Sequence, residues 1–230
     1  MRSGSRTGTA SFEAFLEGWL VRQQHYLDEL LSARQHCHEI RDEDLKDLVC
    51  RILAHYQEYY EEKSIIAQRD VFLVFSPTWF TSFERTFLWI AGFKPGLAFR
   101  LISNSVDDLS EDQHRRMNRL MEETKVEERA LHHELAKIQE SVAAPPLLEI
   151  LGRGGRSING EISEEDNVFA AWRSALESAV ANADALRTNT AVKVVEILSP
   201  AQSVRFLAAV SELQLRIRSW GLQREAEAQE

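Results

Sequence analysis

Histidine and cysteine, which often bind metal ions or act as nucleophiles, gather in one stretch of the sequence. His36, Cys37 and His38 are consecutive, and Cys50 and His55 follow them. Imidazole and thiolate groups are preferred ligands of zinc. However, neighbouring side chains on a helix point about 100° apart, so three in a row cannot converge on one ion there. Because no second cluster with zinc-like spacing follows, we predict no metal site.

Two further patterns could carry chemistry but lack the residues that it needs. Tyr56, Tyr59 and Tyr60 bring three phenols together, yet the sequence offers no base beside them. The glycine-rich stretch 152–160 lacks the G-x-x-x-x-G-K-[ST] spacing of a phosphate loop, and we expect a flexible loop over 144–162. Without a nucleophile beside a base or a converging pair of acids, the sequence predicts a protein that is not an enzyme.

Composition narrows the class of protein. The 230 residues are 44% hydrophobic, which suits one large domain or two small ones with a real core. The net charge of −9 disfavours a broad phosphate-binding surface. Two cysteines cannot form a disulfide framework, no apolar run reaches the roughly 20 residues that span a membrane, and the N-terminus lacks a secretory signal. We therefore expect a protein of the nucleus and/or cytoplasm.

The elements that must position any site are long amphipathic helices. Apolar residues recur at helical spacing from about Ser11 to Arg34, from near Asp42 to Ile66, from Ser110 to about 143, from Ser163 to Ile197, and from Ser199 onward. Several of these helices begin with capping signals, such as Ser199-Pro200-Ala201-Gln202. We predict an all-α fold, a single bundle of about seven or eight helices, several of them long and antiparallel. Residues 11–224 form this domain, and residues 1–10 and 225–230 are expected to be tails, with Gly221 as a helix stop.

The stretch 76–96 is rich in aromatic residues and is bounded by Pro77 and Pro95. We expect the long helices to surround it. The preceding run Val71–Phe75 is interpreted as the end of a helix or a buried connector. Thr81 or Ser82 is expected to cap a helix that continues to about Ile90 and ends at Gly92.

The sequence predicts two ion pairs, one that involves Arg85 and one between Asp184 and Arg187. Arg85 lies among aromatic rings and needs a carboxylate, so we expect a buried ion pair with an acid from another helix. An anchor for an anionic ligand is the alternative. Asp184 and Arg187 are one helical turn apart, and we expect them to pair on the surface.

Three short motifs stand out against the helical background. Residues 12–20 read FEAFLEGWL, residues 79–95 contain W…ER.FLW..GF.P, and residues 183–187 and 197–202 read ADALR and ILSPAQ. Their order resembles the seed-dormancy control (delay-of-germination) domain, which is found in dormancy regulators and as the C-terminal domain of TGA-type basic-zipper transcription factors. The resemblance implies an all-α regulatory domain. Because no basic zipper precedes the domain here, it also implies no direct DNA binding.

The resemblance further implies a partner and a surface that binds it. Dormancy-type members bind type 2C protein phosphatases in abscisic-acid signalling, whereas TGA-like members dock on transcriptional co-regulators. The acidic aromatic first helix is the segment implicated, and a plain core role for the same residues is an equally open interpretation. A homodimer also stays open. The corresponding partner-binding residues are Phe15, Leu16, Glu17, Trp19 and Leu20.

The alternative function is that of a small-molecule sensor. The family implies a lipid acyl chain in an apolar groove, and the hypothetical pocket consists of Trp79, Arg85, Trp89 and Phe93. Some members bind haem through two histidines four residues apart in the last helix. The corresponding positions are Gln214 and Arg218, neither of which is a good axial ligand, so we expect no haem by that route.

Overall fold

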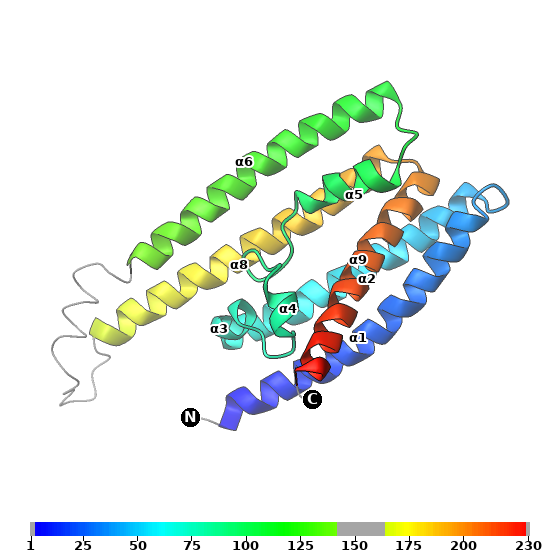
Figure 1. The fold of residues 1–230 in the computed structure, drawn as a ribbon. Helices are drawn as coiled ribbons and strands as arrows, with labels where there is room; N and C mark the ends of the chain where they lie inside the picture. The colour runs from blue at the N-terminus through cyan, green and yellow to red at the C-terminus, as the bar shows by residue number, and fades with distance from the viewer. Residues whose placement is uncertain (1–2, 142–163, 229–230) are drawn as a thin grey trace.

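The computed structural model describes residues 3–141 and 164–228, which form eight helices and no strand. The prediction of an all-α bundle of seven or eight helices is therefore confirmed (Figure 1). The helices are α1 (Ser3–Gln35), α2 (Asp42–Arg69), α3 (Val71–Phe75), α4 (Ser82–Arg85), α5 (Leu97–Ser105), α6 (Glu111–Ser141), α8 (Glu164–Ile197) and α9 (Pro200–Glu227).

Two long antiparallel pairs form the framework. Helices α1 and α2 make one hairpin, and α9 packs against both of them (Figure 1). Helices α6 and α8 make the second pair, which joins the first through contacts of α8 with α2. The short helices α3, α4 and α5 lie between these long elements, and α4 and α5 both pack on α9.

Buried apolar side chains form two core clusters, one on each side of Tyr56, which packs against both. The first is built around Leu30, Ile52 and Leu207, and the second around Trp19. The aromatic stretch 76–96 lies beside the second cluster, but the helices do not surround it completely. Trp79 is buried in the cluster, whereas Phe87 is exposed.

Several predicted helix ends are confirmed because they depend on local hydrogen bonds. Ser199 caps α9 with a reciprocal bond to Gln202, and Thr81 caps α4 in the same way with Glu84. Helix α2 begins at Asp42 as expected, and Val71–Phe75 forms the short helix α3. The predicted cap at Ser163, the loop 144–162 and the stretch 152–160 lie outside the described residues.

Other predicted ends are wrong. Helix α1 already begins at Ser3, so the segment from Ser3 onward is helical rather than a disordered tail. Helix α9 runs through Gly221 to Glu227, so neither the stop nor the tail from 225 is present as predicted. This glycine serves close packing, because a Cβ added there would lie 2.1 Å from Thr81 Oγ1.

Helix α4 is shorter than predicted, ending at Arg85 instead of about Ile90. No α-helix could include Ile90 and Ala91, which have φ values of 44° and 59°, in the left-handed region that residues with a Cβ rarely adopt. The backbone therefore turns sharply between Trp89 and Gly92, which exchange hydrogen bonds. Helix α5 then begins at Leu97, shortly after Pro95.

Candidate functional site

The structure separates the five predicted partner-binding residues of α1. Trp19 is 0% exposed, its Nε1 donates to the His55 carbonyl oxygen at 2.8 Å, and the two rings stack with centroids 4.3 Å apart. Leu16 is also buried. The core interpretation is correct for these two residues, and the prediction that they contact a partner is wrong because neither is accessible.

The remaining three predicted residues do not share one surface. Glu17 is exposed, whereas Phe15 and Leu20 are half-buried. Five helical positions at about 100° each place Phe15 and Leu20 on opposite sides of the buried stripe. Phe15 packs towards Phe12, with ring centroids 5.8 Å apart.

A residue that sequence reasoning missed completes the accessible part of α1. Val21 is 61% exposed and lies one turn after Glu17, next to Leu20. Its signal in the sequence is an apolar side chain that falls outside the buried stripe of the helix. We call Glu17, Leu20 and Val21 the α1 outer surface.

The hypothetical ligand pocket of four residues is not assembled. Trp79 packs into the core, with its ring centroid 4.6 Å from that of Phe12. Trp89 lies beneath the Arg187 guanidinium, and Arg85 is exposed and donates to Pro77 O and Ser82 Oγ. Of the four, Phe93 alone lines the apolar cavity between α2, α8 and α9.

The ion pair predicted for Arg85 is formed by its neighbour. The buried carboxylate of Glu84 lies 3.2 Å from Arg218 Nη1 and also accepts a hydrogen bond from Thr81 N at 2.8 Å. The capping box turns Glu84 towards α9, so the adjacent Arg85 side chain points to solvent. The prediction of a buried pair was right about the segment and wrong about the residue.

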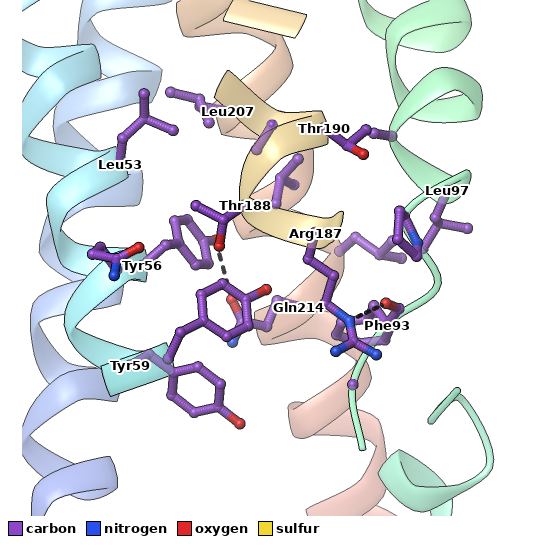
Figure 2. A pocket seen from close by; sticks show the side chains of 18 of the residues that line it. Leu53, Tyr56, Tyr59, Phe93, Leu97, Arg187, Thr188, Thr190, Leu207 and Gln214 are labelled. Carbon is purple, nitrogen blue, oxygen red and sulfur yellow. Dashed lines mark hydrogen bonds between the residues drawn. The ribbon is translucent and has the colours of Figure 1, made fainter. Parts of the chain in front are cut away.

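The cavity with the most apolar lining, which we call the main cavity, has a volume of about 420 Å³, within the range typical of small-molecule sites. It lies between α2, α8, α9 and the chain leading into α5 (Figure 2). Its walls are largely apolar, with residues such as Leu53, Leu97 and Leu207. The polar groups that line it include Tyr56, Tyr59, Tyr60, Lys63, Arg187 and Gln214.

A neutral hydrogen-bond network closes one side of the cavity. Gln23 Nε2 donates to Tyr56 OH at 2.6 Å, and that hydroxyl donates to Gln214 Oε1 at 3.2 Å (Figure 2). Burial raises the pKa of Tyr56, and burial likewise raises the pKa of Tyr59 and of Tyr60. These phenols therefore stay protonated and do not act as bases.

A charged cluster lies beside the cavity, and two of its three members, Lys63 and Arg187, line it. Lys63 Nζ lies 2.8 Å from Asp184 Oδ1, and Arg187 pairs with the same oxygen. The predicted pairing of Asp184 with Arg187 is confirmed, but its predicted surface location is wrong, because the two side chains are only 13% and 5% exposed. Burial lowers the pKa of Lys63 to about 8; Asp184 opposes this shift and Arg187 adds to it.

Arg187 also fixes the tight turn beside the cavity. Its Nε donates to Phe93 O at 2.7 Å (Figure 2). Its Nη2 donates to Ile90 O at 2.8 Å and to Trp89 O. These bonds hold the two residues with positive φ in place. Gly92 is required there, because an added Cβ would lie 2.8 Å from Arg187 Cζ.

The residues at the expected haem positions are used in other contacts. Gln214 accepts from Tyr56, and Arg218 is paired with Glu84. They do not fit an axial-ligand role. Within residues 3–141 and 164–228, no three His, Cys, Asp or Glu side chains lie close enough to hold a metal ion. No helix in the same ranges has an apolar stretch long enough to cross a membrane.

Comparison with known proteins gives a consistent result. The family described as "Seed dormancy control" matches residues 26–104. Protein RESPONSE TO ABA AND SALT 1 of Arabidopsis thaliana is 35% identical over 219 residues, covering 92% of this chain and 95% of that protein. Protein ZW2 of the same plant is 37% identical over 221 residues, covering 94% and 98%.

A transcription factor is also similar along most of this chain. Transcription factor TGA7 of Arabidopsis thaliana is 34% identical over 218 residues, which are 94% of this chain but 57% of that protein. The similarity therefore covers most of this chain and only a part of the transcription factor. All three relatives named here are proteins of Arabidopsis thaliana, and one of them is a transcription factor.

Proposed function

The chain belongs to the seed dormancy control family, and from this membership we propose that it is a non-enzymatic regulatory protein of plants that acts by binding other proteins. One observation carries the proposal: the similarity to Protein RESPONSE TO ABA AND SALT 1 extends over 95% of that protein. The partner class that we propose first is a type 2C protein phosphatase of abscisic-acid signalling. A transcriptional co-regulator is the second class, favoured by the similarity to TGA7. The nucleus and/or cytoplasm is the proposed location.

The α1 outer surface is the proposed contact region. Val21 exposes an apolar side chain beside the carboxylate of Glu17, and Leu20 extends the apolar area to the edge of the core. Interfaces of this kind bury apolar groups at the centre and use charge for orientation. With a net charge of −9, the protein favours a basic partner surface.

Direct binding tests the proposal. Calorimetric titration of the purified chain with a type 2C phosphatase, and separately with a co-regulator, should give a saturable complex with one of them at micromolar concentration or below. Circular dichroism of the same sample confirms that the helices are intact. If the folded protein binds neither class, the proposed function is wrong.

The cavity favours a second candidate, a sensor of lipid acyl chains. An apolar space of about 420 Å³ between α2, α8 and α9 would bury much of such a chain, and Lys63 and Arg187 bring positive charge to its wall. Native mass spectrometry after incubation with a saturated fatty acid should show one bound molecule. Substituting Leu207→Trp, which fills the cavity, should remove it, and retention of the ligand by this variant would count against the cavity as the site.

A further inference from the structure

Lys63 is an amine enclosed in apolar surroundings. Its side chain is only 2% exposed, and it lines the main cavity together with Tyr60 and Arg187. Keeping a charged ammonium group away from water is costly unless other groups compensate for it. The nearest compensating group is Asp184, whose Oδ1 lies 2.8 Å from Lys63 Nζ.

The charges around this amine do not balance. Asp184 contacts two cations, Lys63 and Arg187, and one carboxylate cannot neutralise both. A guanidinium group stays protonated in proteins, so Lys63 is the member that can release a proton. When it does so, a neutral Asp184–Arg187 pair remains. Burial, with a smaller contribution from Arg187, accordingly lowers the pKa of Lys63 to about 8.

Burial and a neighbouring cation both favour the uncharged form of a lysine amine, and the uncharged amine is a nucleophile near neutral pH. An uncharged Lys63 would carry a free lone pair, and Lys63 is one of the residues that line a cavity whose other walls are largely apolar. We propose that Lys63 is a covalent capture site for apolar aldehydes that enter the main cavity. This inference goes beyond protein binding and rests on the second candidate function only in requiring that small molecules reach the cavity.

The reaction is an imine condensation. The lone pair of Lys63 Nζ forms a bond to the aldehyde carbon, and the carbonyl oxygen takes up one amine hydrogen to give a carbinolamine. The hydroxyl group then leaves with the second amine hydrogen as water, and a C=N bond forms. Asp184, at 2.8 Å, is placed to hold and return a proton during both steps. No oxidant or reductant takes part.

Reductive trapping tests the proposal on the full chain. The protein is incubated at pH 8 with octanal and sodium cyanoborohydride, which reduces an imine to a stable amine, and the modified lysines are mapped by mass spectrometry. Lys94 and Lys193 are exposed controls, and Lys94 also lines the cavity. We expect the octyl group on Lys63 ahead of both. If the exposed lysines carry the octyl group and Lys63 does not, the proposal is overturned.

Competition and variants separate the chemical step from access to the cavity. Octanoic acid in excess should protect Lys63 at least severalfold without protecting Lys193. Lys63→Met should lose the cavity adduct, whereas Lys94→Met should keep it. If native mass spectrometry shows octanoic acid bound while Lys63 remains unmodified by octanal, capture is wrong although the cavity is a ligand site. If neither molecule binds, both ideas fail.

Discussion

Arg187 Nε donates to the carbonyl oxygen of Phe93 at 2.7 Å, linking α8 to the turn that precedes α5. The same guanidinium holds Ile90, whose positive φ is unfavourable for a residue with a branched Cβ. One side chain therefore fixes both the shape of the turn and one wall of the main cavity.

Replacement of Arg187 should destabilise the fold strongly. Arg187→Ala leaves the carbonyl oxygens of the turn unpaired and removes one partner of a buried ion pair, which costs about 3 to 5 kcal/mol. Arg173→Ala is the matched control, because this arginine of the same helix also donates to carbonyl oxygens, those of Gln68 and Arg69, but is more exposed. Urea unfolding should give a clearly smaller loss for the control. Equal losses would contradict the role given to Arg187.

Gly18 of α1 and Gly221 of α9 should respond oppositely to replacement by alanine. Gly221→Ala places a Cβ 2.1 Å from Thr81 Oγ1 and should lower the free energy of unfolding. Gly18→Ala meets nothing closer than Arg22 Nη1 at 3.9 Å, so it should gain up to about 1 kcal/mol from helix propensity. Thermal unfolding of both variants measures the difference. A stabilised Gly221→Ala would show that α4 and α9 are not in close contact.

Glu84 and Arg85 should differ in their contributions although they are neighbours. Glu84→Ala removes the buried partner of Arg218 and the acceptor for Thr81 N, so we expect a loss of about 3 kcal/mol. Arg85→Ala changes an exposed side chain and should stay within about 0.5 kcal/mol of the parent. Urea unfolding measures both free energies, and a larger loss of stability for Arg85→Ala would support the buried ion pair that the sequence predicts for Arg85.

Lys63 should make stability rise between about pH 8 and pH 10. Its pKa is lowered from 10.5 to about 8 in the folded protein, mainly by burial. In this interval the unfolded chain binds more protons than the folded one, so raising the pH favours folding, by no more than about 3 kcal/mol. Lys63→Met should remove this increase. The raised pKa values of Tyr56, Tyr59 and Tyr60 act in the opposite sense, but only above about pH 10.

The sequence predicts local features well because their causes are local. Ser199 and Gln202 are three residues apart and bond to each other's backbone, so the start of α9 can be read without knowing the fold. Glu84 and Arg85 show the limit, because which of them turns inward depends on the position of Arg218 in a distant helix.

The candidate site was less accessible to sequence reasoning. The sequence alone cannot distinguish a Trp19 that binds a partner from a Trp19 that packs against His55 in the core, because this depends on how α1 packs against α2. The main cavity is bounded by α2, α8 and α9, so of the predicted pocket residues Phe93 alone was placed correctly. The sequence predicts only a surface pair between Asp184 and Arg187. It gives no sign that Lys63, which comes from another helix, joins this pair in a buried cluster.

The central claim is that the protein acts by binding partners through the α1 outer surface, and one calorimetric titration tests it most directly. A type 2C phosphatase is titrated with the parent chain, with Val21→Asp, and with Val126→Asp on α6 as the control, since these valines are 61% and 59% exposed. We expect Val21→Asp to weaken binding at least about tenfold, or about 1.4 kcal/mol, and the control to bind like the parent. Equal affinities of all three chains would contradict the claim.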